Sequence, residues 1–302
     1  SKPARPPHIL ASGSRSLYAA ARQEVIVTQH PILVATDFKP RSDRAVDRAV
    51  RLARETGREL VVVHAVEDEN ETKTGPSLQD RVASVMPEDA GSYRCLFPEG
   101  SAPRAIAQAV EDEDAFCLVI GVARYNSVGD FFLGTAIDLL LRRSPYPVLI
   151  AKERPRAAYE HIVIGTDLSD ASKRGVEAAV RMFPQAQLHL VHAFHIPYEA
   201  WQNAEYVRKE LASAAQEQCD SFTAQLDVSP ECREKMTMEL VEGSPLTAIN
   251  KTIRKYDAHL CALTSHGYGG LRQALIGSTV SDLLKTLTID TLVIHPEHEK
   301  AD

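Results

Sequence analysis

The chain has 302 residues, of which 44% are hydrophobic and 25% charged, and its formal net charge is −7. This composition is typical of a soluble globular protein with enough length for two domains. The acidic balance argues against nucleic acid or an anionic membrane as a main partner, and no apolar run approaches the ~20 residues that a membrane helix needs. We therefore expect no nucleic-acid partner and no membrane partner.

The N-terminal arm and the cysteines bear on the cellular compartment. Residues 1–30 contain Pro, Arg and Ser but lack the apolar segment and cleavage site of a signal peptide. The five cysteines are odd in number, and none belongs to a C-x-x-C pair. Free thiols are typical of a reducing environment, so we expect a cytoplasmic protein.

From residue 31 onward the predicted elements occur twice. Four landmarks recur in the same order: "ILVATD" at 32–37 and "IVIGTD" at 162–167, "VVVHA" at 61–65 and "LHLVHA" at 188–193, "EGSAPRAI" at 99–106 and "EGSPLTAI" at 242–249, and "PVLIAK" at 147–152 and "TLVIHP" at 291–296. A repeat of about 140 residues is too long for a solenoid unit and has the size of a domain. We predict a first domain at 31–153, a linker at 154–159 and a second domain at 160–298.

Each copy alternates predicted strands and helices, and Ser42, Ser101, Ser169 and Ser244 are candidate helix N-caps. The strands are apolar on both faces, as in a parallel sheet covered on each side. The pattern predicts an α/β fold with two tandem doubly wound domains, each an open five-stranded parallel sheet flanked by helices. An insertion of about 15 residues in the second copy predicts an amphipathic helix, because Leu211, Cys219, Phe222 and others recur at helical spacing.

The last strand of each copy is a short apolar segment that could end its sheet at an edge. An exposed apolar edge is a liability unless it is paired or covered. We expect the two copies to meet through 147–152 and 291–296 as an intramolecular pseudo-dimer, and a homodimer stays open.

Polar residues follow the predicted strands. Asp37 and Asp167 end the first strands, where a carboxylate could lie beside a ribose or a metal-bound phosphate, or could simply form a turn or cap. His64 and His192 lie within apolar strands, which favours core histidines satisfied by a neighbour. His189, His192 and His195 do not share one face of a strand, so we predict no metal site.

A glycine-rich loop follows the fourth strand of the second copy, "TSHGYGGLRQALIGS" at 264–278. A loop that leaves a strand and enters a helix presents backbone N–H groups and the positive end of the helix dipole, which suits a phosphate. The alternative is a plain surface loop with a capping serine. The first copy reads "GVARYNSVGDFFLGT" at 121–135.

On these motifs, residues 31–298 resemble a tandem universal stress protein, with an adenine nucleotide α-hydrolase-like fold in each half. Nucleotide-binding members of that family carry G-x2-G-x9-G-[ST] after the fourth strand and an Asp at the end of the first. The second copy reads Thr264-x2-Gly267-x9-Gly277-Ser278, and the first reads Gly121-x2-Arg124-x9-Gly134-Thr135. The spacing is intact in both, and each copy has lost a different glycine.

The resemblance implies ATP, with or without Mg²⁺, bound mainly in the second domain. The nucleotide-binding residues implied there are Asp167 at the ribose, Ala193 at the adenine, and Thr264, His266, Gly267, Gly277, Ser278 and Thr279 around the phosphates. A degenerate second site is implied at Asp37, Ala65, Gly121, Arg124, Gly134 and Thr135. Arg124 replaces the glycine of the loop, where its side chain would either fill the phosphate space or bind an anion itself.

The chain lacks a Gly-Lys-Ser/Thr phosphate loop and any evident catalytic triad. We therefore predict a stress-response protein with a regulatory or protective role, no catalytic residues and at most slow ATP hydrolysis. The alternatives are a signalling scaffold that acts without nucleotide, and a binder of another small metabolite or lipid.

Overall fold

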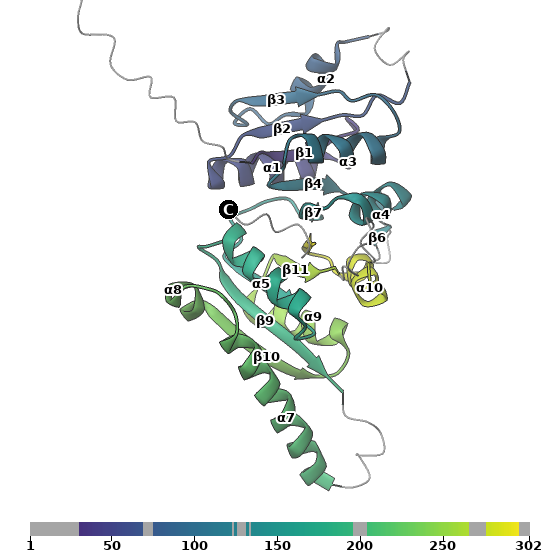
Figure 1. Ribbon diagram of the computed structural model, residues 1–302. Helices are drawn as coiled ribbons and strands as arrows, with labels where there is room; N and C mark the ends of the chain where they lie inside the picture. Colours follow the sequence, from purple (N-terminus) through teal and green to yellow (C-terminus); the bar gives the residue numbers. More distant parts are fainter. Residues whose placement is uncertain are drawn as a thin grey trace, which may run out of the picture.

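We analysed a computed structural model of the chain (Figure 1). The structure describes residues 30–68, 75–122, 124–125, 131–132, 134–195, 204–265 and 276–295. Two predicted nucleotide-binding residues, His266 and Gly267, lie outside these ranges, as does the N-terminal arm before residue 30.

The N-terminal half contains five main strands, with helices in the connections between them. Its elements are β1 (Ile32–Ala35), α1 (Asp43–Thr56), β2 (Leu60–Val63), α2 (Leu78–Val85), β3 (Tyr93–Leu96), α3 (Ala102–Asp112), β4 (Cys117–Gly121), β5 (Arg124–Tyr125), β6 (Phe131–Phe132), α4 (Gly134–Arg143) and β7 (Val148–Ala151).

The C-terminal half repeats this order and adds a long helix between its second and third strands. Its elements are β8 (His161–Gly165), α5 (Asp170–Met182), β9 (Gln187–Phe194), α7 (Ala204–Ala224), α8 (Pro230–Glu234), β10 (Met236–Glu242), α9 (Pro245–Tyr256), β11 (Leu260–Thr264), α10 (Ser278–Thr286) and β12 (Asp290–Ile294).

The two halves share one ten-stranded sheet in the order β10-β9-β8-β11-β12-β7-β4-β1-β2-β3. Neighbouring strands within each half are parallel, whereas β12 and β7 pair antiparallel where the halves meet. We call this β7–β12 pairing the seam, and Leu149 lies opposite Leu292 in its register. The predicted meeting of the two last strands is therefore confirmed, and it joins the two expected five-stranded sheets into one.

Helices cover both faces of the sheet, and each face has a hydrophobic core that runs through both halves. One core packs α3, α4, α9 and α10 against the sheet, and the other packs α1, α2, α5 and α7 against the opposite face. Leu149 and Leu292 both belong to the second core and are fully buried. The halves are thus bonded through the sheet and packed together on both of its faces.

Two of the four predicted N-caps act as expected. The hydroxyls of Ser169 and Ser244 accept hydrogen bonds from the backbone of Ser172 and Thr247. Ser42 and Ser101 also precede their helices, but their side chains form no cap bond. The Ser42 hydroxyl instead donates to the Lys39 carbonyl at 2.8 Å.

The inserted helix α7 is only partly amphipathic. Cys219 and Phe222, near its C-terminal end, are buried, whereas Tyr206 and Leu211 are 68% and 37% exposed. Figure 1 shows the reason: α7 runs away from the sheet, so its N-terminal part has no layer to pack against. The predicted helix is therefore present, and its apolar residues are buried near its C-terminal end.

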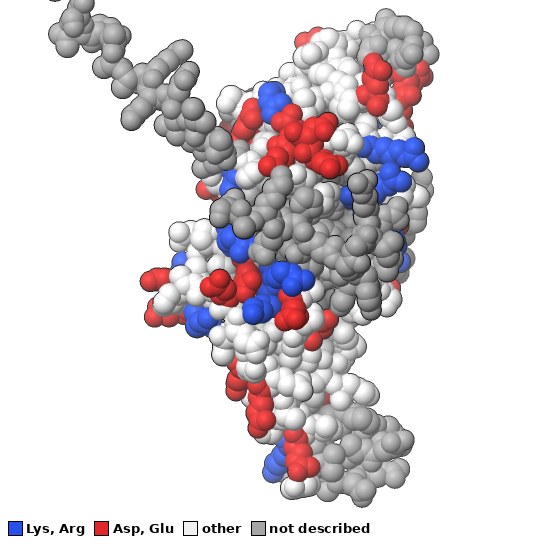
Figure 2. Space-filling view, viewed as in Figure 1, with Lys and Arg blue, Asp and Glu red and all other residues white. Residues whose placement is uncertain are grey.

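Surface charge, the state of the cysteines and the character of the helices complete the description of the fold. Basic and acidic side chains are interspersed over both halves on the face drawn in Figure 2. All five cysteines are free, and Cys117, Cys219 and Cys261 are buried. No helix among the described residues combines the length and the apolar character needed to cross a membrane.

Candidate functional site

The Thr-Asp pair that ends the first strand builds the same turn in both halves. In each turn, the threonine hydroxyl and the aspartate carboxylate both accept a hydrogen bond from the backbone N–H two residues further along. The four bonds are Phe38 N–H to Thr36 Oγ1 (3.0 Å), Lys39 N–H to Asp37 Oδ1 (3.2 Å), Leu168 N–H to Thr166 Oγ1 (3.0 Å) and Ser169 N–H to Asp167 Oδ1 (3.0 Å). The turns hold both carboxylates at the carboxyl ends of β1 and β8, and the two aspartates do form turns.

A histidine on the second strand fixes the same turn from the side. His64 Nδ1 lies 2.9 Å from the Thr36 carbonyl oxygen, and His192 Nδ1 lies 3.0 Å from that of Thr166. A carbonyl oxygen can only accept, so Nδ1 carries the proton in both rings. A neighbour thus satisfies each ring, as expected, but only His64 is buried in the core, whereas His192 is half-buried. Both rings line the cavities described next.

The cavity of the C-terminal half lies at the carboxyl ends of β8, β9 and β11 and has a volume of about 370 Å³. It brings together four predicted site residues: Asp167, Ala193, Thr264 and Thr279. Its other walls are mainly apolar and come from the strands, α9 and α10. Asp167 is the single lining residue with a permanent charge among those that the structure describes.

Gly277 and Ser278 lie at the start of α10, beside this cavity. Gly277 is the N-cap with φ −59° and ψ 153°, and the first intrahelical bond runs from Ser281 N–H to its carbonyl. The backbone N–H groups of the first turn therefore precede the helical hydrogen-bond ladder. Because Thr279 and Val280 line the cavity, this helix end adjoins it.

The equivalent cavity of the N-terminal half is larger, about 630 Å³, and more highly charged. It brings together five predicted residues: Asp37, Ala65, Gly121, Gly134 and Thr135. Its charged lining residues are Asp37, Lys39, Arg41, Glu67 and Arg81. The sequence analysis did not identify the last four, although Lys39 and Arg41 directly follow the Thr-Asp pair and could have been recognised by that position.

The two strand-end carboxylates differ in their partners. Arg41 donates from Nε to Asp37 Oδ2 at 2.7 Å and adds a second bond from its guanidinium, and Lys39 Nζ lies 3.8 Å away. In the C-terminal half, the Ser172 hydroxyl donates to Asp167 Oδ1 at 2.6 Å, and Ala171 occupies the position of Arg41. A guanidinium thus neutralises Asp37, whereas a hydroxyl and a backbone N–H hold Asp167.

The two halves differ at the first glycine of the motif, which is Gly121 in the N-terminal half and Thr264 in the C-terminal half. A Cβ on Gly121 would lie 2.7 Å from the Arg41 carbonyl oxygen, so the N-terminal half needs glycine there. In the C-terminal half, Thr264 occupies this position and packs against Gly175 of α5, where a Cβ would meet Thr264 Oγ1 at 2.0 Å. The change to threonine is accommodated by a glycine on the facing helix.

The stretch predicted to be a second phosphate loop contains a β-hairpin. The backbone of Arg124 lies in β5 and pairs with Phe132 of β6, and β6 contacts α10 of the other half. Gly134 adopts φ 80°, unlike Gly277. The side chain of Arg124 lies outside the described residues, so its predicted position at the phosphates stays a prediction.

No metal site emerges from the described residues, which contain no group of three or more His, Cys, Asp and Glu side chains suited to a metal ion. His189 and His161 do approach each other, with Nε2 and Nδ1 3.0 Å apart, but His189 Nδ1 bonds to Thr237 and its ring stacks on Tyr256. These contacts describe a packed aromatic cluster at the far end of β9 from the cavity.

Fold and cavities together define a tandem doubly wound α/β protein with one strand-end cavity in each half. The chain belongs to the universal stress protein family, whose family model matches residues 29–152 and again 158–295. It is 22% identical to a universal stress protein of Mycolicibacterium smegmatis over 300 residues, which covers 89% of this chain and 98% of that protein.

Solved structures show the same fold. A universal stress protein of Archaeoglobus fulgidus superposes with a TM-score of 0.64 at 17% identity, covering 88% of this chain and 98% of its own. A putative universal stress protein of Pseudomonas aeruginosa superposes with a TM-score of 0.63 at 21% identity, covering 88% of this chain and 93% of its own.

Proposed function

We propose that this protein binds an adenine nucleotide, ATP, in the cavity of its C-terminal half, and acts in the stress response as a regulatory or protective protein. The observation that carries the proposal is the pairing, within one cavity, of the Asp167 carboxylate with the first turn of α10. A carboxylate can accept from ribose hydroxyls, and free N–H groups at a helix N-terminus suit phosphates. Apolar walls between them suit the base.

The size and charge of the cavity are compatible with this ligand. Its volume of about 370 Å³ falls within the range of roughly 300–1,000 Å³ that is usual for small-molecule sites. Thr264, the departure from the family motif, packs against Gly175 rather than obstructing the strand end. Both features support the C-terminal cavity as the nucleotide site.

The N-terminal cavity is, in this proposal, a degenerate site. Two nitrogens of Arg41 already donate to Asp37 Oδ2, so a ribose would have to displace a guanidinium. Hydrogen bonds between ionised partners are stronger than those between neutral ones. We expect this cavity to bind ATP weakly or not at all.

Calorimetric titration of the full chain with ATP, with and without Mg²⁺, tests the proposal. We expect one site per chain. Asp167→Asn should weaken binding at least tenfold, because Asn keeps one oxygen for the Ser169 and Ser172 bonds but replaces the second oxygen, an acceptor for ribose hydroxyls, with an NH2 group. Asp37→Asn is the matched control and should change the affinity less than twofold.

Gly277→Val provides a second test in the same cavity. A branched side chain at the N-cap of α10 would enter the phosphate space, so nucleotide binding should be lost while the urea midpoint stays close to that of the parent. Unchanged affinity in both Asp167→Asn and Gly277→Val would refute the assignment. ATP turnover above about 1 s⁻¹, within the usual enzyme range, would refute the non-catalytic role.

A second candidate is a nucleotide-independent role with a different anionic metabolite in the N-terminal half. The observation in its favour is the larger cavity, which is lined by Lys39, Arg41 and Arg81. Mass spectrometry of small molecules that co-purify with the chain separates the two. A non-nucleotide anion whose binding is lost in Arg81→Gln and kept in Asp167→Asn would favour this second role.

A further inference from the structure

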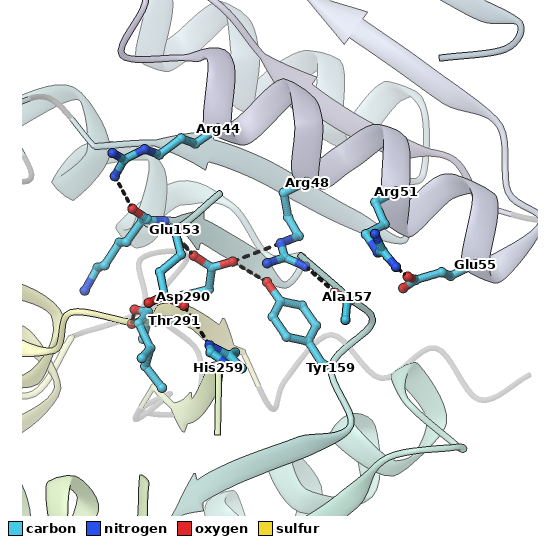
Figure 3. Close-up of polar contacts among 12 residues, drawn as sticks. Arg44, Arg48, Arg51, Glu55, Glu153, Ala157, Tyr159, His259, Asp290 and Thr291 are labelled. Atoms are coloured by element: carbon cyan, nitrogen blue, oxygen red, sulfur yellow. Dashed lines mark hydrogen bonds and ion pairs between the residues drawn. The ribbon is translucent and has the colours of Figure 1, made fainter. Parts of the chain in front are cut away.

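A third cavity lies between the two halves, away from both strand-end cavities. It has a volume of about 510 Å³ and is formed by α1, the end of β7, the linker, and the segments before β11 and β12 (Figure 3). Arg44 and Arg48 line it from the first half, and His259 and Thr288 line it from the second. We call this cavity the interdomain cleft.

A buried ion pair anchors one side of the cleft. Asp290 is fully buried at the start of β12, and its Oδ2 lies 2.9 Å from Arg48 Nε on α1. Tyr159 donates its hydroxyl to the same carboxylate, and the Arg48 guanidinium lies 4.1 Å from the Tyr159 ring centre. We call Arg48, Tyr159 and Asp290 the clasp, because it bonds the first half, the linker and the second half together.

The clasp is completed by backbone donors. The N–H groups of Lys152 and Glu153 donate to Asp290 Oδ1 at 2.6 and 2.9 Å. The Asp290 carboxylate therefore has donors on both oxygens, and its charge is matched by that of Arg48. The remaining cations of the cleft are not needed to neutralise it.

Two of these cations are fixed in place. Lys152 Nζ donates to the carbonyls of Leu284 and Leu287 at 2.8 and 2.7 Å, at the C-terminal end of α10. Burial lowers the pKa of Lys152 to about 8. Arg44 donates to the Lys152 carbonyl oxygen. Backbone oxygens thus fix the position of both side chains.

The rim adds two exposed arginines, Arg154 and Arg156, from the linker. The described lining residues thus include four arginines and Lys152, whereas Glu153 is the single acidic residue among them. Glu153 lies 3.0 Å from His259, and Asp47 acts on Arg154 at longer range. The lining is therefore mainly basic, in a chain whose net charge is −7.

We propose that the interdomain cleft is a binding site for a small phosphorylated anion. Guanidinium groups present several N–H donors in a planar fork that fits phosphate oxygens. Arg44 would contact the anion from a fixed position on α1, and Arg154 and Arg156 would approach it from the rim. Domain interfaces are frequent locations of small-molecule sites.

Inorganic pyrophosphate is the probe. Titration calorimetry on the full chain, at constant ionic strength of about 0.15 M, should give one pyrophosphate site. The double variant Arg154→Gln/Arg156→Gln should raise Kd at least tenfold, which corresponds to about 1.4 kcal/mol. The matched control Arg54→Gln/Arg142→Gln removes the same charge from exposed ion pairs elsewhere and should change Kd less than twofold.

Three further measurements distinguish binding in the interdomain cleft from binding in the strand-end cavities and from general charge attraction. Pyrophosphate binding should persist in Asp37→Asn and Gly277→Val, and sulfate at the same ionic strength should not displace it. A parent chain that binds no pyrophosphate, an equal loss in both double variants, or a loss confined to the strand-end variants would each overturn the proposal.

Discussion

The two strand-end cavities share a backbone and differ in their charges. In both halves a Thr-Asp turn and a histidine bonded to the threonine carbonyl shape the end of the first strand. The N-terminal cavity then adds Lys39, Arg41 and Arg81, whereas the C-terminal cavity keeps Asp167 as its one permanent charge among the described lining residues.

This difference shows which residues a duplicated fold can change. The turn residues bond to backbone atoms that both halves need, so replacing them would disturb the fold itself. The side chains that face the cavities bond to little of the fold and are open to change. Two halves of one chain can therefore keep one architecture while their ligand preferences diverge.

The two cavities belong to halves that are joined at the seam, so breaking the seam should have the largest effect on the stability of the protein. Leu149→Lys combined with Leu292→Lys places two buried ammonium groups opposite each other in the β7–β12 register. Burying an unpaired charge costs several kcal/mol, a large fraction of the roughly 5–15 kcal/mol that stabilises a typical protein. We expect loss of the folded state or separation of the halves, measured by urea unfolding and gel filtration.

Leu211→Lys on the exposed part of α7 is the control, and it should change stability by less than about 0.5 kcal/mol. If the double variant unfolds at the midpoint of the parent, the seam does not hold the halves together. Separately expressed halves that stay monomeric with full stability would lead to the same conclusion.

Removing the clasp is the next largest change, and it tests an interaction that joins the two halves beside the seam. Asp290→Asn leaves Arg48 buried without its counter-charge, and such a loss costs about 3–5 kcal/mol. Asp138→Asn, which breaks an exposed pair with Arg142, should cost at most about 1 kcal/mol. Urea denaturation of both variants checks the contrast. Equal effects would mean that the clasp contributes no more than a surface pair.

The free energy of unfolding should depend on pH through His189, a buried histidine of the C-terminal half. Burial, followed by the charge of His161, lowers the pKa of His189 to about 4 from an ordinary value near 6.5. The unfolded chain therefore binds a proton between these values that the folded chain does not. The resulting stability is fully present above pH 6.5 and is lost as the pH falls toward 4.

Between pH 7 and pH 5 the titration of His189 should lower the free energy of unfolding by about 2 kcal/mol. His189→Gln should reduce the loss of unfolding free energy over that interval by this amount, as measured by urea titration at both pH values. The same slope in parent and variant would show that His189 titrates normally in the folded protein.

The smallest expected change bears directly on the two cavities. Arg124→Gly restores the family glycine in the N-terminal half, and we expect ATP binding there to strengthen by roughly tenfold or less, about 1 kcal/mol. Calorimetry should then detect a second, weaker site. A stoichiometry that stays at one would indicate that the Asp37–Arg41 pair, rather than Arg124, limits this cavity.

Local and repeated patterns made the fold predictable. The Thr-Asp pairs, the apolar strands and the doubled landmarks predicted the sheet, the two halves and the seam, because each of these features depends on neighbours in sequence or on the repeat. The clasp was not predictable in this way. Arg48 and Asp290 are far apart in the chain, and neither belongs to a repeated motif. The accommodation of Thr264 by Gly175 is likewise visible only in three dimensions.

The position of β12 at the end of the chain has a consequence during synthesis. β7 is complete at Ala151, but its partner strand does not emerge from the ribosome until residues 290–294 have been translated. At about 5–20 residues per second, the nascent N-terminal half waits roughly 7–28 s with an apolar strand edge unpaired. Two nascent chains on one messenger could pair through that edge and exchange halves. Pro145 and Pro147, which precede β7 and lack N–H donors, shorten the edge that a neighbouring chain could join.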